Sequence, residues 1–361
     1  MHIPDGYLSP STCATFYVLA AAGWYAALRR VKRFLATRAI PLISVFAAFS
    51  FVVMMFNVPL PGGTTGHAVG IGVAVIVLGQ WGSILAISMA IAIQALFFGD
   101  GGITTLGANC FNMAIVGSFA AHFVYRLIAA GATLSSQRRI LAAAAAGYVA
   151  INASALVAAI ELGVQPTFFH DAAGTPLYAP YSMRVAVPAM MIGHLTFAGL
   201  AEAVISAGMV SYLQRVDLGL LRGVGGFAEI SGAITVGENT ERPPRQLWWV
   251  VGALMLLTPL GILAAGTAWG EWSSADFANP HTRQQIGAAS RNHAPPPSVP
   301  VGIQKLSTLW TAPFPGYAPR FIKNPAMGYL LSAMFGVGFL VLVSLAVKNF
   351  GKRRPRRRLP S

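Results

Sequence analysis

Nine long apolar stretches follow one another along the chain, and almost no charged residues interrupt them. They cover residues 9–28, 40–58, 67–79, 82–98, 107–126, 140–162, 185–211, 248–268 and 327–347. A helix needs about 20 mostly apolar residues to cross a bilayer, and most of these stretches reach that length. Only 10% of the residues are charged, whereas soluble domains carry about 25%. The sequence therefore predicts an all-α polytopic membrane protein with nine spans.

The third stretch differs from the others because it is short and rich in glycine. It contains or adjoins Gly66, Gly70, Gly72 and Gly79. Small residues let helices approach one another closely, and a helix too short to cross a bilayer is tolerated only inside a bundle. We expect residues 67–79 to form a half-span or a helix packed inside the bundle.

Basic residues are distributed unevenly among the loops. With the N terminus outside, 19 of the 25 Lys and Arg residues fall in the inner segments 29–38, 80–81, 126–139, 212–247 and 348–361. The outer segments hold only Arg184, Arg283, Arg291, Lys305, Arg320 and Lys323. Because cytoplasmic loops carry an excess of Lys and Arg, this split predicts an outside N terminus, a cytoplasmic C terminus and an odd number of spans.

The net charge of +14 would suggest nucleic-acid binding in a soluble chain. Here the charge lies in loops between spans, and no nucleic-acid module is present in the sequence. We therefore predict no nucleic-acid partner, and we expect the basic run 352–358 to bind anionic membrane lipid. Cys13 and Cys110 are too few for a disulfide framework and are expected to be small buried residues.

The first two residues form a candidate metal chelate. Met1 and His2 offer three nitrogens in order, namely the α-amine, the amide of His2 and its imidazole Nδ1, which close fused rings in one plane. A fourth nitrogen would complete the square-planar set that suits Ni²⁺ or Cu²⁺. We expect Met1 to be the mature N terminus, because no signal-peptide pattern is present and a bulky second residue disfavours removal of the initiator Met. The alternative is a frayed terminus without a function.

His67 is the candidate for the fourth nitrogen. It follows the Gly-, Pro- and Thr-rich segment 59–66 on the outer side, where glycines let the backbone approach a ligand closely. The competing interpretation is a loop histidine bonded to a backbone carbonyl. The remaining histidines are His122, near the inner end of a span, His170, His281 and His293, in outer loops, and His194, within a span.

Glu202 is the carboxylate that lies deepest within a predicted span. His194 precedes it by eight residues, a little over two helical turns, so the two side chains are expected on one helix face. An acid within the membrane is costly and is a functional candidate by default. Two interpretations stand open: a proton relay through His194 and Glu202, or a structural acid bonded to a neighbouring helix.

A second outer Gly-rich loop, residues 98–107, contains Asp100 and precedes two asparagines. Asn109 and Asn112 are three residues apart on one helix face, where they either orient a site or bond across helices. Outer acidic residues are expected to attract cations; they are Asp5, Asp100, Glu161, Asp171, Glu271 and Asp276.

The chain divides into two parts. Residues 1–221 contain seven spans, and residues 222–246 form a polar, Gly- and Pro-containing linker on the inner side. Residues 247–361 contain two spans around an outer loop, 269–326, and end in the basic tail. That loop is rich in proline and in aromatic residues, so parts of it are expected to lie on the first part. We expect the two parts to work as separate chains.

Sequence motifs for common enzymatic chemistry are absent. The chain has no Gly-x-x-x-x-Gly-Lys-Ser/Thr loop for a nucleotide phosphate. It also has no His-Glu-x-x-His or Gly-x-Ser-x-Gly motif of a hydrolase. We predict that the chain is not an enzyme and holds no resident cofactor.

Three motifs together resemble a known family. They are Met1-His2-Ile3-Pro4-Asp5-Gly6, the sequence Gly-Thr-Thr-Gly-His at 63–67, and the sequence Asp-Gly-Gly-Ile-Thr-Thr-Leu-Gly-Ala-Asn at 100–109. Residues 1 to about 221 are similar to the CbiM/NikM substrate-binding (S) component of cobalt and nickel energy-coupling-factor (ECF) transporters, a family linked to cobalamin biosynthesis. Residues 248–347 resemble, less specifically, the two-span CbiN/NikN accessory component, and residues 269–272, Trp-Gly-Glu-Trp, look like its fused form.

The resemblance implies a seven-helix S-component bundle plus two further transmembrane helices. It implies that Co²⁺ or Ni²⁺ is the transported ligand, bound at the outer face by the amine of Met1, the amide and imidazole of His2, and His67. It also implies an import complex in the bacterial inner membrane with a transmembrane coupling (T) subunit and cytoplasmic ATPase subunits. The competing transport hypothesis is a self-sufficient, proton-coupled secondary transporter that uses His194 and Glu202.

Overall fold

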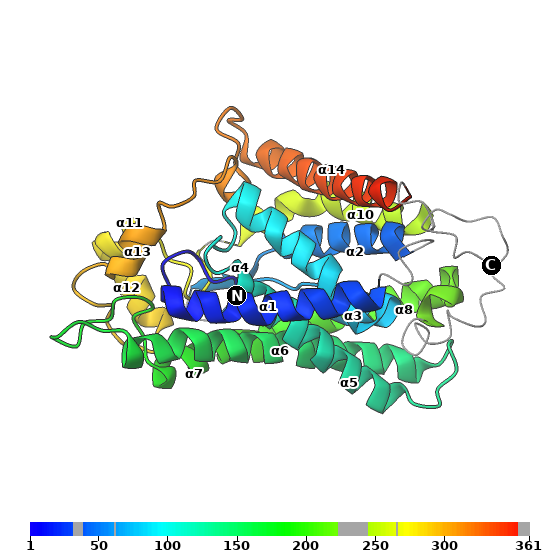
Figure 1. Cartoon of the computed structure of the whole chain (residues 1–361), viewed down its shortest axis with the longest axis horizontal. Helices are drawn as coiled ribbons and strands as arrows, with labels where there is room; N and C mark the ends of the chain where they lie inside the picture. The colour runs from blue at the N-terminus through cyan, green and yellow to red at the C-terminus, as the bar shows by residue number, and fades with distance from the viewer. Residues whose placement is uncertain (32–38, 61–62, 223–244, 265, 353–361) are drawn as a thin grey trace, which may run out of the picture.

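The computed structural model describes residues 1–31, 39–60, 63–222, 245–264 and 266–352. It is an elongated bundle whose long helices run roughly along one axis, with the short helices α11, α12 and α13 at one end (Figure 1). The helices are α1 (Pro10–Val31), α2 (Ala39–Met54), α3 (Ile71–Ile93), η1 (Gln94–Phe98), α4 (Leu106–Asn109), η2 (Cys110–Val116), α5 (Gly117–Ala129), α6 (Gln137–Phe168), α7 (Met183–Gly193), η3 (His194–Ala198), α8 (Gly199–Val216), η4 (Leu218–Arg222), α10 (Arg245–Leu257), η5 (Thr258–Leu263), α11 (Ser274–Ala278), α12 (Pro280–Ala289), α13 (Val301–Leu306), η6 (Pro315–Tyr317) and α14 (Pro325–Lys352).

Seven helical stretches of the described chain are long and apolar enough to cross a membrane: Pro10–Val31, Ile71–Phe98, Leu106–Ala129, Gln137–Phe168, Met183–Val216, Arg245–Leu263 and Pro325–Ala346. The predicted fold class, an all-α polytopic membrane protein, is confirmed. The number of helical stretches long enough to cross a membrane is seven rather than the nine predicted, for two reasons. The apolar helix Ile40–Met54 is shorter than a full crossing, and the predicted third and fourth spans form one continuous stretch.

That stretch, Ile71–Phe98, reverses its direction at Gly79. A straight helix of this length would be about 40 Å long. Yet Gly70 at one end lies against the ring of Phe49, and Phe98 at the other end contacts the ring of Phe51, two residues further along α2. A straight helix could not bring both ends to neighbouring residues of α2, so the chain turns back at Gly79. Residues 71–79 are all buried, as expected for a short helix packed inside the bundle, but this helix begins at Ile71 rather than at residue 67.

Replacing Gly79 by Ala is expected to destabilise the protein. Gly79 has φ 70 and ψ 167, a region of backbone conformation that is open essentially to glycine alone and costs other residues about 1–3 kcal/mol. The melting temperature of the purified protein in detergent measures this loss of stability. Gly208→Ala is the matched control, because Gly208 lies in α8 with open space around it and alanine favours a helix over glycine by about 1 kcal/mol. Equal melting temperatures for the two variants would contradict the reversal at Gly79.

The centre of the bundle is packed through small residues. A Cβ added to Gly72 would lie 2.4 Å from the hydroxyl of Ser206 and 2.9 Å from the Cα of Gly147. Helices α3, α8 and α6 therefore touch nearly backbone to backbone at this point. The close approach fixes where α3 begins, and the loop that carries His67 leads directly into that start.

A short antiparallel hairpin precedes the His67 loop. Strand β1 (Val58–Leu60) pairs with β2 (Thr64–Gly66), with Pro59 opposite Thr65. The predicted second span, 40–58, overlaps the start of this hairpin. The helix instead ends at Met54, and Pro59 and the glycines that follow lead the chain back toward α3. The hairpin holds His67 at the end of the bundle where the N-terminal residues lie.

The second part of the chain packs on the first. Helices α10 and α14 lie against α2, and the backbone of Gly336 in α14 sits on the ring of Phe51. The amide of Gly302 donates to the carbonyl of Leu177 (2.7 Å). The prediction that parts of the outer loop 269–326 lie on the first part is therefore confirmed. Most of the predicted linker 222–246 lies outside the described residues.

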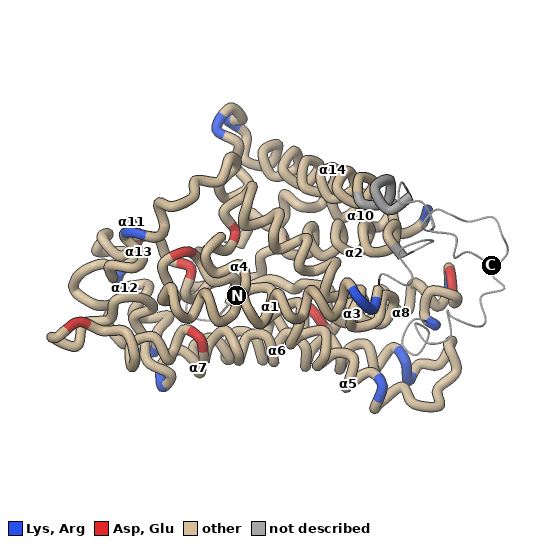
Figure 2. The backbone as a smooth tube through the Cα atoms, viewed as in Figure 1, with Lys and Arg blue, Asp and Glu red and all other residues tan. Residues whose placement is uncertain are grey.

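Charged residues mark the two ends of the bundle. Arginines occupy the last turns of α1, α5 and α8, as Arg29 and Arg30, Arg126, and Arg215. Figure 2 shows a group of basic positions toward the end of the bundle where α5 and α8 end, and most of the acidic positions toward the other half. This is the arrangement that the predicted orientation requires, because basic residues favour the cytoplasmic face.

Candidate metal centre

The N-terminal segment is buried and held in place by its backbone. Met1, His2 and Ile3 are only 3%, 2% and 0% exposed. The amide of Ile3 donates to Oδ1 of Asn109 (2.8 Å), and its carbonyl accepts from Nδ2 of the same residue (3.0 Å) and from the hydroxyl of Thr105. The interpretation of this segment as a frayed terminus is therefore wrong. Asn109 is the polar group that sets the position of the chain's first residues.

Asp5 joins this segment to the Gly-rich loop that follows η1. Its carboxylate accepts from the amides of Ile103 (3.1 Å) and Thr104 (2.7 Å) and from the Thr104 hydroxyl. The amide of Gly102 in turn donates to the carbonyl of Ile3 (3.0 Å). The first residues and the loop that carries Asp100 therefore form one unit.

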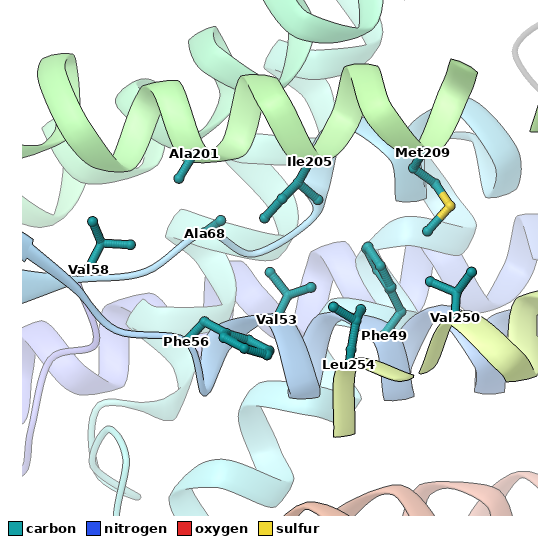
Figure 3. Close-up of a pocket in the computed structure, with 10 residues that line it drawn as sticks. All are labelled: Phe49, Val53, Phe56, Val58, Ala68, Ala201, Ile205, Met209, Val250 and Leu254. Atoms are coloured by element: carbon teal, nitrogen blue, oxygen red, sulfur yellow. The ribbon is translucent and has the colours of Figure 1, made fainter. Parts of the chain in front are cut away.

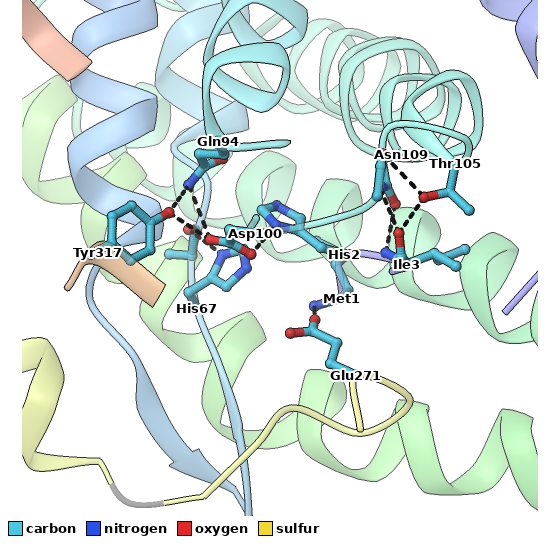
Figure 4. Close-up of polar contacts among 12 residues, drawn as sticks. Met1, His2, Ile3, His67, Gln94, Asp100, Thr105, Asn109, Glu271 and Tyr317 are labelled. Carbon is cyan, nitrogen blue, oxygen red and sulfur yellow. Dashed lines mark hydrogen bonds and ion pairs between the residues drawn. The ribbon is translucent and has the colours of Figure 1, made fainter. Parts of the chain in front are cut away.

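His2, His67 and Asp100 face one another in the structure (Figure 4). The centres of the His2 and His67 rings lie 4.9 Å apart. Nδ1 of His2 lies 2.5 Å from Oδ1 of Asp100. Burial alone would raise the pKa of Asp100, but the neighbouring His2 and His67 rings and the hydroxyl of Tyr317 hold it below its usual range. Asp100 is therefore a carboxylate beside the two imidazoles.

His67 presents one nitrogen as a free ligand atom. Its Nδ1 donates to the carbonyl of Ala68 (3.0 Å), so Nε2 carries the lone pair. Among the described residues, neither Nε2 of His67 nor Nε2 of His2 has a hydrogen-bond partner, although both are buried. Burial lowers the pKa of His67 well below its usual value, and the charge of the N-terminal amine and of His2 adds to this effect. The neutral imidazole is the form that binds a metal ion.

The outer loop of the second part reaches this centre with two side chains. Oε1 of Glu271 lies 3.2 Å from the amine of Met1. The hydroxyl of Tyr317 donates to Oδ2 of Asp100 (2.6 Å) and accepts from Nε2 of Gln94 (2.8 Å). Burial raises the pKa of Tyr317 well above its usual value, and the charge of Asp100 adds to this, so the hydroxyl remains a donor.

The donor set combines backbone and side-chain nitrogens. In the described part of the chain, no three His, Cys, Asp or Glu side chains come together as a group that could hold a metal ion. The predicted site does not need such a group, because two of its four nitrogens belong to the amine of Met1 and the amide of His2. It does need Nδ1 of His2, which in the structure faces Asp100. The His2 ring must therefore turn away from that contact before the predicted chelate can form.

Glu202 and His194 bond to different partners. The carboxylate of Glu202 accepts from the amides of Val69 (2.7 Å), Gly70 (2.8 Å) and Gly72 (3.2 Å), at the start of α3. Nδ1 of His194 donates to the carbonyl of Met190 (2.9 Å). The expected common face is interrupted by the π-helical turn η3, which separates the two residues. Glu202 thus holds the loop that follows His67.

The remaining candidates have structural partners. Asn112 donates to Glu161 across helices (2.8 Å), whereas Asn109 orients the N-terminal segment, so the two predicted roles of the asparagines both occur. Asp276 caps α11, and Asp171 holds an exposed turn. Of the six outer acids, Asp100 and Glu271 lie at the candidate centre. The two cysteines are buried, as predicted.

Three residues that bond to the candidate centre were not predicted: Thr105, Gln94 and Tyr317. Thr105 lies within the 100–109 motif, which is a signal that could have identified it. Gln94 is a polar residue inside an otherwise apolar stretch, and an uncharged polar side chain in a span commonly bonds across helices. Tyr317 lies 217 residues from Asp100 in a Pro-rich loop, and no local pattern marks it.

One apolar cavity lies outside this centre. It has a volume of about 360 Å³ and lies between α2, α8 and α10 (Figure 3). Its lining is almost entirely carbon, with residues Phe49, Val53, Phe56, Val58, Ala68, Ala201, Ile205, Met209, Val250 and Leu254. A cavity without polar groups offers a divalent cation no oxygen or nitrogen ligand.

The metal-free protein is expected to lose stability as the pH falls below about 6.5. The pKa of His67 in the folded protein lies well below its ordinary value, which is about 6.5 in an unfolded chain. Below that pH the unfolded state takes up a proton that the folded state does not, so the free energy of unfolding falls. Melting temperatures between pH 7.5 and 5.5 should fall less steeply for His67→Gln than for wild type. His281→Gln, at an exposed position, should follow wild type; equal slopes for all three proteins would contradict the prediction.

Comparison with known proteins identifies the family of this chain. The family model of CbiM, the cobalt uptake substrate-specific transmembrane region, matches residues 2–220, and that of the PDGLE domain matches residues 245–352. The fused nickel transport protein NikMN of Rhodobacter capsulatus is 52% identical to this chain, over 94% of this chain and 95% of its own length. The cobalt transport protein CbiM of Geobacter sulfurreducens is 31% identical, over 76% and 75%.

A solved structure is also similar. The crystal structure of a transition metal transporter matches with a TM-score of 0.57 and 47% sequence identity, covering 63% of this chain and 99% of that one. A helical membrane bundle with a buried N-terminal histidine centre and these relatives defines a metal transport protein rather than an enzyme. The chain belongs to the CbiM family, and its second part carries a PDGLE domain.

Proposed function

We propose that this chain is the substrate-binding component of an ATP-driven, ECF-type importer of Ni²⁺ or Co²⁺. It lies in the bacterial inner membrane with its N terminus outside and its C terminus in the cytoplasm. Residues 1–221 form the metal-binding S component, 222–246 a cytoplasmic linker and 247–361 the accessory part. A transmembrane coupling subunit and cytoplasmic ATPases complete the transporter. The observation that carries the proposal is the burial of Met1 and His2 beside the free Nε2 of His67.

The ion binds to four nitrogens: the amine of Met1, the amide and Nδ1 of His2, and Nε2 of His67. In the empty site, Glu271 holds the amine and Asp100 holds the imidazole of His2. Both carboxylates remain beside the cation when the nitrogens turn to it, and their charge offsets that of the ion. Four nitrogens in one plane suit Ni²⁺, and the relative from Rhodobacter capsulatus is a nickel transport protein.

The bonding of Glu202 supports this proposal over a proton-coupled secondary transporter. A proton relay needs a carboxylate that is free to exchange its proton. Both oxygens of Glu202 instead accept from backbone amides at the start of α3. Protonation of Glu202 would remove an acceptor from these amides and loosen the loop that carries His67.

Uptake of radioactive nickel into cells tests the proposal. The full chain, expressed with its T subunit and ATPases in cells that lack other nickel importers, should support uptake. Omission of the ATPases should abolish that uptake, and metal analysis of the purified chain should find one bound ion. Uptake that survives loss of the ATPases would favour the secondary transporter. A reporter fused after Ser361 should be active on the cytoplasmic side only, and activity outside would overturn the orientation.

A further inference from the structure

The apolar cavity between α2, α8 and α10 runs along the helices. On α8 it is lined by Ala201, Ile205 and Met209, one residue from each of three successive turns, which together extend about 12 Å along the helix axis. On α10 it is lined by Val250 and Leu254 (Figure 3). All of these residues except Met209 are only half-buried. The cavity is therefore long and is open to the outside of the bundle.

The opening lies between two helices that face the hydrocarbon of the membrane. Both belong to stretches long enough to cross a bilayer, Met183–Val216 and Arg245–Leu263. Beside the cavity, Val204 of α8 is 69% exposed and Trp249 of α10 is 65% exposed. An apolar cavity of about 150 Å³ already takes up an apolar ligand, and this one has about 360 Å³. Because walls that face empty space lose their van der Waals contacts, a hydrocarbon chain from the bilayer is the group that suits this cavity.

With the proposed orientation, the cavity lies in the cytoplasmic half of the membrane. Helix α10 begins at Arg245, and Arg215 lies in the last turn of α8. At 1.5 Å per residue, Val250 is about 8 Å from Arg245 along its helix, and Ile205 is about 15 Å from Arg215 along the other. Half of the hydrocarbon core is about 15 Å thick. An acyl chain whose head group lies at the level of the two arginines therefore reaches the cavity.

The same two arginines suit an anionic head group. Both are exposed, and neither forms a salt bridge with another of the described residues. The acid nearest to Arg215 in sequence, Asp217, accepts from the amide of Gly219 (2.9 Å). The guanidinium of Arg245 lies 5.6 Å from the ring centre of Trp249, and tryptophan is typical of a membrane interface. Basic residues near the cytoplasmic ends of transmembrane helices attract anionic lipids.

We propose that this cavity binds one acyl chain of an anionic phospholipid from the cytoplasmic leaflet, with the head group beside Arg215 and Arg245. A helix of a partner protein does not fit, because one turn of a helix about 10–12 Å across occupies more than about 400 Å³. The inference uses the proposed orientation but not the metal centre. Ala68, the residue after His67, also lines the cavity, so the bound chain packs against the loop that carries His67 and stabilises the folded protein.

Native mass spectrometry of the purified full chain in detergent tests the proposal, with equal amounts of phosphatidylglycerol and phosphatidylcholine of identical acyl chains added. Wild type should retain one phospholipid per chain. Phosphatidylglycerol should be in about 30-fold excess, because each of the two arginines favours an anionic head group about 5-fold. Ala201→Phe fills the cavity with a ring and should retain no lipid. Val204→Phe is the matched control, since it places the same ring on the exposed side of α8, and it should retain lipid like wild type.

Two further measurements complete the test. Replacing both Arg215 and Arg245 by Gln leaves the cavity intact, so one phospholipid should remain bound with the two lipids within about 2-fold of each other. Added phosphatidylglycerol should raise the melting temperature of wild type and Val204→Phe, because a ligand of the folded state stabilises it, but not that of Ala201→Phe.

The outcomes separate this inference from the proposed function. Equal lipid retention by wild type and Ala201→Phe would overturn the cavity as the binding site. Equal retention of the two lipids by wild type would overturn the anionic head group. If Ala201→Phe does not fold, an unchanged preference for phosphatidylglycerol in the double arginine variant would overturn the proposal by itself. Loss of nickel binding or uptake in the wild-type chain would overturn the proposed function and leave the lipid site standing.

Discussion

Insertion of one alanine between Met1 and His2 is expected to abolish uptake of Ni²⁺ and Co²⁺, as fully as His67→Ala or His2→Ala. The insertion keeps every side chain and changes no charge. It converts the two-residue chelate into a three-residue one, which already has four nitrogens and no use for His67. The loss should exceed the roughly 100-fold effect of removing an outer-shell partner.

The structure adds a steric reason for that result. The backbone of Ile3 is held by Asn109 and Gly102, so the segment cannot slide to absorb an extra residue. One residue spans up to about 3.6 Å, whereas the amine of Met1 is buried within 3.2 Å of Glu271. The amine must therefore leave its position or force the loop of the accessory part away.

Uptake of both ions into cells that also express the T subunit and the ATPases is the measurement. The matched control is one alanine inserted between Ala172 and Ala173, in an exposed turn, which should leave uptake unchanged. Wild-type uptake by the N-terminal insertion would mean that Met1 and His2 are not the metal site. Loss of uptake in both insertions would point to general damage to the fold.

The helices of this protein could be predicted because a membrane leaves few alternatives. Apolar runs such as 140–162 have the length of a span, and the helix observed there, α6, contains that range. The break between the predicted spans 67–79 and 82–98 could also be predicted, and the structure places it at Gly79. The hydrophobicity of the residues on its two sides does not show whether the helix only bends there or reverses its direction. The hairpin of β1 and β2 was missed because two three-residue strands have no periodicity long enough to recognise.

The candidate metal centre was predictable as a motif but not as a network. Met1, His2 and His67 could be proposed as ligands from residue type and from a family resemblance, and the structure brings the rings of His2 and His67 together. The partners of these residues come from distant parts of the chain. Asp100 and Glu271 could be predicted only as outer acids, because sequence spacing does not tell which loops meet at one end of a bundle. Geometry assigns each of them to a different nitrogen.

Replacement of Glu202 is expected to lower both metal affinity and stability. The carboxylate is 0% exposed and accepts from three backbone amides that lead from His67 into α3. Glu202→Ala leaves those amides buried without an acceptor, at about 1–3 kcal/mol for each unsatisfied group. Glu202→Gln keeps one acceptor oxygen but turns an NH₂ group toward the amides. Its free energy of unfolding should therefore fall by less, about 1–3 kcal/mol in total. In both variants the His67 loop loses its anchor, and Ni²⁺ binding should weaken in the same order.

The pattern of losses separates an anchor from a proton relay. A relay residue acts in transport and not in equilibrium binding, so Glu202→Gln would then abolish uptake while the melting temperature and the Ni²⁺ affinity stayed at wild-type values. If Glu202 is instead an anchor, the melting temperature and the Ni²⁺ affinity of Glu202→Gln should fall together, and uptake should fall with them. Glu161→Gln is the control, because this buried carboxylate of α6 bonds to Asn112 rather than to the His67 loop. Glu161→Gln should leave the Ni²⁺ affinity unchanged. A loss of affinity seen only in the Glu202 variants would then reflect the hydrogen bonds of Glu202 with the amides at the start of α3.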